Sequence, residues 1–491
     1  MNIIKHGDKD GVWLLDAFVR DMAKRGVDGV RQGLIGRDRV FETPFGEKRL
    51  LYADYVASGR ALDPVEDFIR RDVLPFYANT HTEASYCGRA TSRLREAVRA
   101  RIAELVGAEG DCHVVFSGAG ATSGINRLVA MLDVERAKHA VVFIGPYEHH
   151  SNVLPWRESG ADVREVRARP DGHLDLEDLA RSLRRLGGAD LVVGSFSAAS
   201  NVTGIITDTD RVSQILRAHG AFAVWDYAGG GPYLPINMSS GDTSKDAVVF
   251  SPHKFPGGPG ASGILVVRDR VIRHQKPDIT GGGTVSFVSP WQHRYLDRLE
   301  ARYEAGTPNI IGDIRAGLAM LVKHAIGLDT IAERDAQLRG RALRAFTDPR
   351  LEVLERGATP ALPIFSFRVR NDEGELLHHQ LVTRILSDFY GIQARGGCAC
   401  AGPYAHALLR IDRTASEALL QQLQAGQELT KPGWVRFNLS YLHDEAEIAA
   451  ILDAIAELPD RVGELAPLYQ ADPKTARFAW SGHPAAASSV A

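Results

Sequence analysis

The stretch "VVFSPHKFPGGPGASGILVV", residues 248–267, decides the fold of this chain. Two apolar runs frame a short polar turn, which is typical of neighbouring strands covered on both faces. The turn and the start of the second run carry His253, Lys254 and four glycines. A buried ammonium group is costly unless it is paired or loses its proton. The stretch therefore predicts a buried lysine with a chemical role at the end of a strand.

Similar apolar runs recur on the N-terminal side of this stretch. Together with it, they predict strands at His113–Ser117, His139–Gly145, Asp190–Ser197, Ala221–Asp226, Asp246–Ser251 and Ser262–Val267. Helix-like segments lie between them, at Thr122–Leu132 and Leu176–Leu186. This alternation predicts an α/β fold with a central, mostly parallel sheet. In such sheets ligands bind at the carboxyl ends of the strands, where the polar residues of this chain gather.

The pattern changes after "TPN" (307–309). A helical pattern over 310–346 precedes a strand-like "PIFSFRV" (363–369), a helix near 375–389, the loop "GIQARGGCACAGPY" (391–404), a strand "GWVRFNLS" (433–440) and a helix over 443–457. We interpret this part as a smaller α+β domain. The predicted division is an N-terminal segment (1–47), a large domain (48–306), a small domain (307–470) and a flexible tail (471–491).

Composition excludes several classes of protein. The 491 residues are 44% hydrophobic and 24% charged, with a net charge of −3, so nothing global favours nucleic acid or a membrane as partner. Four cysteines are too few for a disulfide framework, and neither a signal peptide nor an apolar run of about 18 residues is evident. We expect a cytoplasmic protein with reduced thiols. A solvated helix face is predicted for the arginine cluster of Arg89, Arg93, Arg95, Arg99 and Arg101.

Polar motifs follow several of the predicted strands. The Gly-rich turn "FSGAGATSGIN" (116–126) leads into a helix near Thr122, and helix N-termini bind phosphate well. Asp226, in "VWDYAGG" (224–230), could cap a helix or pair with a cationic ring nitrogen. Ser251 and His253 could hold a phosphate while Lys254 carries an aldehyde as a Schiff base.

A fourth motif, "GPYEHHSNVLPW" (145–156), places His149 and His150 after another strand. One of these histidines could stack on a flat ring. Each motif alone also has an ordinary structural explanation, as a tight turn, a cap or a surface charge. Together they are the parts of a pyridoxal phosphate site, and all lie at strand ends.

From residue 50 to residue 448 the chain resembles class V aminotransferase-fold enzymes, in particular the group II cysteine desulfurases and selenocysteine lyases. The resemblance rests on "LLYADYVASG" (50–59), "EHHSNVLPW" (148–156), "SFSAASNVTG" (195–204), "SPHKFPGGPGASGIL" (251–265), "YEAGTPN" (303–309), "RGGCAC" (395–400) and "VRFNLSYLHDEAEI" (435–448). It implies the PLP-dependent transferase fold, aspartate aminotransferase-like and of fold type I. That fold has a seven-stranded, mostly parallel sheet, and its cofactor is pyridoxal 5′-phosphate.

The resemblance also implies roles for single residues. Lys254 is the Schiff-base lysine and proton shuttle, His149 stacks on the ring and Asp226 pairs with the ring nitrogen. The cofactor phosphate is contacted by Ala121 through its backbone, Thr122, Ser251, His253 and Thr307 of the neighbouring subunit, which implies a homodimer. The substrate carboxylate is bound by Asn201 and Arg436 with Arg395 close by, and His81 lines the substrate side.

The loop "RGGCACAGPY" (395–404) carries the expected nucleophile. In desulfurases of this group the nucleophilic cysteine follows an arginine by five positions, and from Arg395 that count reaches Cys400. Cys398 stands where the family commonly has histidine, so that the Cys-x-Cys arrangement is more similar to molybdenum-cofactor sulfurases. Cys398 could resolve a persulfide or fill space. A zinc site with His406 is disfavoured because no partner pair at ligand spacing is evident, and no metal is expected.

The leading hypothesis is a cysteine desulfurase that converts L-cysteine to L-alanine, leaves a persulfide on Cys400 and can pass sulfur to an acceptor protein. Two alternatives stay open. One is another reaction of the same fold, a β-lyase, epimerase or aminotransferase acting on another amino acid. The other is a slow PLP-containing sulfur carrier that needs a partner. The chain departs from the family at Ala121, where a threonine is usual, and in "YAGGG" after Asp226.

Overall fold

The protein forms two compact units in a computed structural model that describes residues 11–80 and 83–482. Within these residues the first unit comprises 11–35, 57–80, 83–199 and 207–332, and the second comprises 36–56, 200–206 and 333–482. The sequence predicted a boundary at 306/307. The structure places residues 307–332 in the first unit because helix α9 (Ile310–Ile326) packs against α1 (Gly11–Gln32) and α3 (Tyr86–Leu105).

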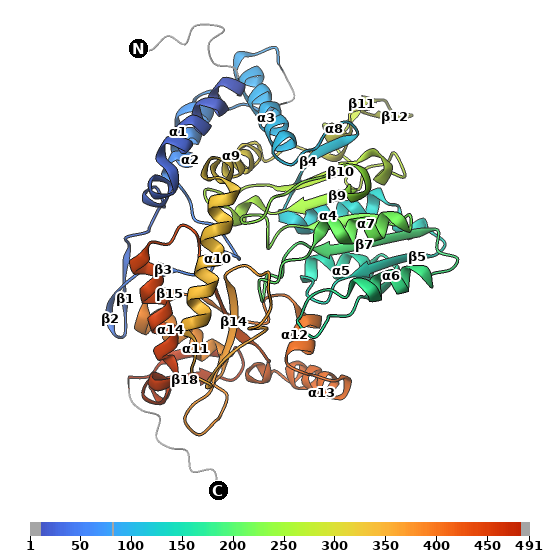
Figure 1. Cartoon of the computed structure of the whole chain (residues 1–491). Coiled ribbons are helices and arrows are strands. Elements are labelled where there is room, and N and C mark those ends of the chain that lie inside the picture. Colours follow the sequence, from blue (N-terminus) through green and yellow to red (C-terminus); the bar gives the residue numbers. More distant parts are fainter. Residues whose placement is uncertain (1–10, 81–82, 483–491) are drawn as a thin grey trace, which may run out of the picture. The chain divides into compact units, whose positions relative to one another are not determined.

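A seven-stranded sheet forms the centre of the first unit, as predicted, in the order β4-β10-β9-β8-β7-β5-β6. Its strands are β4 (Cys112–Gly118), β5 (Ala140–Ile144), β6 (Asp162–Glu165), β7 (Leu191–Ser197), β8 (Phe222–Asp226), β9 (Ala247–Phe250) and β10 (Gly263–Arg268). Five neighbouring strands, β9, β8, β7, β5 and β6, are parallel to one another. Strand β10 is antiparallel to both of its neighbours, β4 and β9 (Figure 1). The six predicted strands are confirmed, and the polar edge strand β6 was not predicted.

Helices cover this sheet and complete its core. Helix α4 (Gly120–Met131) packs against β4, β9 and β10, where Ile125 and Leu128 are fully buried. Burial of side chains of this size stabilises the fold by about 1.5–3 kcal/mol each. Helix α7 (Thr209–Ala218) packs against β8, where the indole of Trp225 donates to Ser213 Oγ at 3.0 Å. Further helices are α2 (Asp63–Phe68), α5 (Leu154–Glu158), α6 (Leu176–Arg184) and α8 (Leu299–Tyr303), and β11 (Val285–Val288) pairs with β12 (His293–Tyr295).

Glycines in the stretch 248–267 let the chain turn back tightly after β9. A Cβ atom on Gly258 would lie 1.9 Å from the carbonyl oxygen of Pro252, which no side chain tolerates. The turn Pro252–Lys254 is therefore held close to the strand end, and Lys254 with it. Lys254 is half-buried, so it is less enclosed than the predicted buried lysine. The glycines make room for backbone at this turn, whose His253 and Lys254 are both half-buried.

The arginine cluster on α3 is not a solvated face throughout. Arg95 and Arg99 are buried, and both bind Glu304, at 2.6 and 2.7 Å. Arg95 also binds Asp313 at 2.7 Å, and both guanidinium groups lie over the ring of Phe116. The prediction failed because the buried acids lie between 205 and 218 positions away in the sequence, which a pattern in α3 does not reveal.

The second unit contains a four-stranded antiparallel sheet in the order β13-β14-β17-β16. Its strands are β13 (Leu351–Val353), β14 (Ile364–Val369), β16 (Arg395–Gly397) and β17 (Trp434–Asn438). A short parallel pair, β3 (Leu51–Tyr52) with β15 (Ile392–Gln393), brings residues 50–56 into this unit. The helices are α11 (His379–Tyr390), α12 (Gly402–Leu408), α13 (Arg413–Gln424) and α14 (Glu445–Leu465). Side chains of α11, α14, β14 and β17 share one hydrophobic core.

Two further expectations differ from the structure. The helical pattern over 310–346 is two helices, α9 and α10 (Leu328–Ala345), because Gly327 between them has a φ of 92°. In the predicted flexible tail, residues 471–482 are ordered by the antiparallel pair β18 (Tyr469–Asp472) and β19 (Arg477–Trp480). A second hairpin, β1 (Val40–Thr43) with β2 (Gly46–Arg49), lies in the N-terminal segment. Along residues 11–80 and 83–482, no helix has both the length and the apolar character to cross a membrane.

Candidate active site

Lys254, Ser251 and His253 form one tight turn after β9. The Lys254 backbone N–H donates to Ser251 O at 3.0 Å. Burial, with a smaller contribution from the Lys254 charge, lowers the pKa of His253 to about 4. His253 is therefore neutral near pH 7 in the free protein, and one ring nitrogen can donate while the other accepts.

The Gly-rich turn 118–120 lies against this lysine turn. The Ala121 N–H, in the first turn of α4, donates to Ser251 Oγ at 2.9 Å. Gly120 has a φ of 63°, and a Cβ there would lie 2.9 Å from Ser251 Oγ and 3.0 Å from His253 Cε1. Glycine is thus needed for the close approach of the two turns. The N-terminus of α4 and the Ser251–His253 turn make a cradle that fits a phosphate group.

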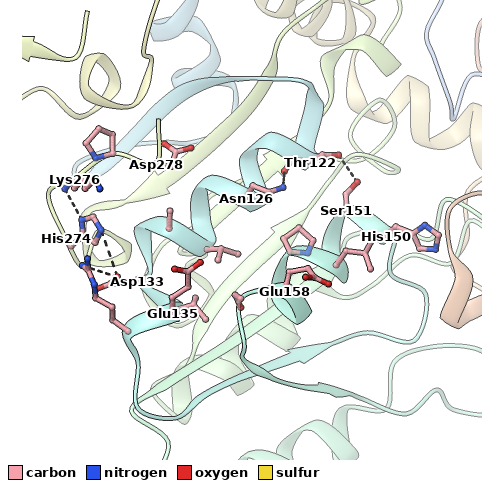
Figure 2. Close-up of a pocket in the computed structure, with 18 residues that line it drawn as sticks. Thr122, Asn126, Asp133, Glu135, His150, Ser151, Glu158, His274, Lys276 and Asp278 are labelled. Atoms are coloured by element: carbon pink, nitrogen blue, oxygen red, sulfur yellow. Dashed lines mark hydrogen bonds and ion pairs between the residues drawn. The ribbon is translucent and has the colours of Figure 1, made fainter. Parts of the chain in front are cut away.

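His149 is oriented by Ser151, and Thr122 of α4 contacts the Ser151 hydroxyl in turn. The Ser151 N–H donates to His149 Nδ1 at 3.1 Å, so Nδ1 carries a lone pair and the neutral ring has its proton on Nε2. Ser151 Oγ lies 3.0 Å from the same nitrogen and 2.7 Å from Thr122 Oγ1. Figure 2 shows this Thr122–Ser151 contact at one end of a pocket of about 640 Å³ beside α4. Thr122 thereby links the cradle to the predicted stacking histidine.

A buried network behind His149 was missed by the sequence reasoning. Glu148, which is 3% exposed, accepts from Ser197 N (2.9 Å), Ser197 Oγ (2.6 Å) and Asn152 Nδ2 (2.7 Å). Burial raises the pKa of Glu148 to about 7 against these hydrogen bonds. Asn152 Oδ1 accepts from Trp156 Nε1 at 3.2 Å. The network holds the "EHHSNVLPW" segment against β7. Glu148, Asn152 and Trp156 follow one another at intervals of four residues, and this spacing is the sequence signal that could have predicted the network.

Asp226 ends β8 in a fully buried position. Its Oδ1 accepts from the Ala228 N–H at 2.7 Å. Burial raises the pKa of Asp226, and the Ala228 hydrogen bond and the Lys254 charge oppose that rise. A buried carboxylate of this kind is complementary to a cation. The residues of the first unit therefore fit a group with a phosphate at one end and a protonated ring nitrogen at the other.

The predicted carboxylate-binding residues lie together in the second unit. Arg436 is buried and donates to Asn201 O at 3.2 Å and to Asp54 Oδ1 at 2.9 Å. Asn201 Nδ2 donates to Ala399 O at 3.0 Å, so this side chain holds the cysteine loop. Burial lowers the pKa of Arg436, against raising contributions from Asp54 and the neighbouring Cys400. Asp54 stands in the "LLYADYVASG" motif, but no role was predicted for it, because its partners Arg436 and Arg395 lie more than 300 positions away in the sequence.

Cys400 lies on a strained turn. The Ala401 N–H donates to Cys398 O at 3.1 Å, and the two central residues, Ala399 and Cys400, have φ values of 53° and 55°. Non-glycine residues in this conformation cost about 1–2 kcal/mol each. Cys400 is exposed on this turn, whereas Cys398 is half-buried. Strain of this kind clusters at functional sites.

Two further residues of the predicted site are Thr307 and His81, and His406 is the histidine of the disfavoured zinc site. Thr307 is exposed in the loop before α9, and His81 lies outside the described residues. His406 uses both ring nitrogens in hydrogen bonds of 2.9 Å, to Gly402 O and Ser416 Oγ. The described part of the chain contains no group of three or more side chains arranged to hold a metal ion. Predicted residues thus gather in two sets, one in each unit, and their individual roles stay predictions.

The fold is that of PLP-dependent transferases, with a large α/β unit and a smaller α+β unit. A solved structure with this fold is the apo cysteine desulfurase from Thermococcus onnurineus NA1. It matches with a TM-score of 0.71 and 24% identity, over 88% of this chain and 98% of that one.

Residues 51–450 match the class V aminotransferase family, and the chain belongs to it. It is therefore an enzyme of that family. Relatives include a cysteine desulfurase from Salmonella agona, 30% identical over 363 residues, which cover 72% of this chain and 85% of the relative. A probable cysteine desulfurase from Pyrococcus abyssi is 28% identical over 365 residues, or 72% and 86% of the two chains.

Proposed function

We propose that this protein is a pyridoxal phosphate-dependent cysteine desulfurase that converts L-cysteine to L-alanine and leaves the sulfur as a persulfide on Cys400. The placement of Cys400 carries this proposal. This exposed residue follows Arg395 on a strained turn that Asn201 connects to the Arg436 cluster. A β-lyase, epimerase or aminotransferase has no need of a thiol there, whereas sulfur abstraction requires one.

The first unit would hold the cofactor with the residues described above. Lys254 would bind its aldehyde, Asp226 its ring nitrogen, and Ser251, His253 and the Ala121–Thr122 turn its phosphate. When bound, pyridoxal phosphate supplies an electron sink for the substrate's α-carbon. The Lys254 amine removes and returns the proton at that carbon. His149 would stack on the cofactor ring, and with Nδ1 accepting from Ser151 its proton on Nε2 would be available for donation.

The second unit would bind the substrate carboxylate through Arg436 and its neighbours. Cys400 Sγ attacks the sulfur of L-cysteine, so that an S–S bond forms and the substrate's Cβ–S bond breaks. The electron pair of the broken bond stays with the substrate, which takes up a proton and leaves as L-alanine. No external oxidant is needed, because the two sulfur atoms are oxidised to the persulfide level while the substrate's Cβ is reduced to the methyl group of alanine.

The partners belong to the same proposal. We infer a homodimer because Thr307 is exposed in its loop, where it could reach the phosphate of a second copy, and closed two-fold assemblies are the commonest oligomers. Light scattering that finds a stable and fully active monomer would contradict this inference. The exposure of Cys400 also suits delivery of the persulfide sulfur to an acceptor protein.

The decisive assay incubates the purified holoprotein with L-cysteine and a thiol reductant and measures alanine, sulfide and pyruvate. Equal amounts of alanine and sulfide are expected. Pyruvate in place of alanine would assign β-elimination instead. The Lys254→Ala variant should lose both the visible absorption of the bound cofactor and turnover, and a wild-type protein that takes up no pyridoxal phosphate would end the proposal.

A further inference from the structure

One carboxylate lies between the two arginines of the second unit. Asp54 Oδ1 accepts from Arg436 Nη2 at 2.9 Å. Asp54 Oδ2 accepts from Arg395 Nε at 3.0 Å and lies 2.9 Å from Arg395 Nη2. Asp54 is 7% exposed, so its charge is little screened by water. Each guanidinium group therefore shares the same buried counterion.

The fold fixes Asp54 in this position from both sides. The Ala53 N–H donates to Gln393 O at 3.0 Å, and the Asn438 N–H donates to Ala53 O at 2.8 Å. The Val56 N–H donates to Asn438 Oδ1 at 3.0 Å. Short backbone bonds thus hold residues 53–56 against the ends of β15 and β17, and the carboxylate has little freedom to withdraw.

The two arginines need a counterion. Arg395 and Arg436 stand directly opposite each other in the β16–β17 register, where like charges destabilise a sheet. Asp54 neutralises one of the two positive charges and leaves a net charge of one. Arg436 Nε is buried and has no hydrogen-bond partner among the described residues, so this arginine retains one donor for a ligand oxygen.

We propose that Asp54 determines specificity for amino acids with one carboxylate. It lowers the net charge of the arginine site to a single positive charge, which pairs with one carboxylate. This rests on the proposed function, in which Arg436 binds the substrate carboxylate. An amino acid with a single carboxylate matches the net charge that remains, and an amino acid with two carboxylates brings one negative charge too many. Asp54 acts through the arginines and contacts no reacting atom, so it is a positioning residue.

The test compares L-alanine and L-aspartate as ligands of the holoprotein. Their dissociation constants are measured by calorimetry and their inhibition constants against L-cysteine turnover. Asp54→Asn restores the second positive charge and should shift the alanine-to-aspartate affinity ratio about tenfold toward aspartate. Asp38→Asn is the matched control, since Asp38 pairs with Arg49 at 3.3 Å in an exposed position, and it should leave the ratio unchanged.

Arg395→Gln tests the same charge balance with the opposite sign. It removes a positive charge that Asp54 now balances, and the ratio should move about tenfold away from aspartate. This variant also keeps the test decisive if Asp54→Asn fails to fold, because Arg395 is half-exposed. A ratio that stays at the wild-type value in both variants would reduce Asp54 to a structural ion pair and overturn the proposal.

The two proposals fail in distinguishable ways. If L-cysteine yields no alanine, the desulfurase function is wrong, but the calorimetric ratio still reports on Asp54. If L-cysteine yields alanine and the ratio does not move, only the role of Asp54 is wrong.

Discussion

Replacement of Glu304 by glutamine should destabilise the first unit. In the wild-type protein this buried carboxylate accepts from Arg99 Nη1 (2.7 Å) and Nη2 (2.9 Å), Arg95 Nη2 (2.6 Å) and the Phe116 N–H (2.8 Å). Glutamine keeps one carbonyl oxygen, but its NH₂ group faces guanidinium donors and its charge is gone. Glu304 lies three residues before Thr307, so the same hydrogen bonds also fix the start of the loop that carries Thr307.

The expected loss of stability in Glu304→Gln is that of removing one partner of a buried ion pair. Removal of one partner of such a pair costs about 3–5 kcal/mol. Because glutamine retains part of the hydrogen bonding, we expect the lower end of that range. A loss of about 3 kcal/mol lowers the melting temperature by about 6 °C for a unit of this size.

The difference in stability between the wild type and Glu304→Gln should become smaller at low pH. Burial raises the pKa of Glu304, but the charges and hydrogen bonds of Arg99 and Arg95 outweigh it, so the net pKa lies below the ordinary value of 4.5. A carboxyl group whose pKa is lower in the folded state stabilises the protein at pH values above its ordinary pKa of 4.5. This stabilisation is lost as the pH falls through the folded-state pKa. The difference between wild type and variant should therefore shrink below about pH 4.5.

Differential scanning calorimetry at several pH values measures the effect. The matched control is Glu104→Gln, because Glu104 pairs with Arg101 at 2.6 Å in a position that is 66% exposed. Such a surface pair contributes about 0–1 kcal/mol, so the control should change little. Equal melting temperatures for both variants, or a difference that does not vary with pH, would refute the reasoning.

Three further variants probe the proposed cofactor site. Asp226→Asn should weaken retention of pyridoxal phosphate by about 2 kcal/mol or more, measured by dialysis, because it removes a buried charge partner. Gly120→Ala should cost at least about 1 kcal/mol from its φ alone, and the contact with Ser251 Oγ adds to that loss in thermal unfolding. Since the pKa of His253 is lowered to about 4 from 6.5, the stability of the cofactor-free protein should fall as the pH drops between these values. His253→Gln should flatten that slope, and an unchanged slope would show that another group titrates.

The sheet could be predicted from the sequence because each buried strand is an almost continuous apolar run. The six runs that define β4, β5, β7, β8, β9 and β10 satisfy that condition. Strand β6 (Asp162–Glu165) does not, because it lies at the sheet edge with three polar, exposed positions. The break between α9 and α10 depends on the conformation of Gly327, which is one glycine among 48 in the sequence.

Within the candidate site, residues that carry familiar chemistry were predictable, whereas the residues that hold them in place were not. Lys254, His149 and Cys400 stand in motifs whose residue types indicate a reaction. Asp54 and Glu148 are single acids whose partners come from distant segments, such as Arg436 and Ser197. The role of Asp54 depends on contacts that only the folded chain makes, whereas for Glu148 the four-residue spacing to Asn152 was a local signal and only the Ser197 partner is distant.

The most direct test of the central claim is the location of the transferred sulfur. The holoprotein is treated with L-cysteine without reductant, its thiols are trapped by alkylation, and the 398–400 peptide is analysed by mass spectrometry. We predict an additional sulfur atom on Cys400 in the wild type and in Cys398→Ala. Cys400→Ala should carry none, form no alanine and still bind the cofactor. Wild-type alanine formation by Cys400→Ala would contradict the desulfurase mechanism. If Cys398→Ala were the inactive variant, the nucleophile would be two residues earlier in the chain.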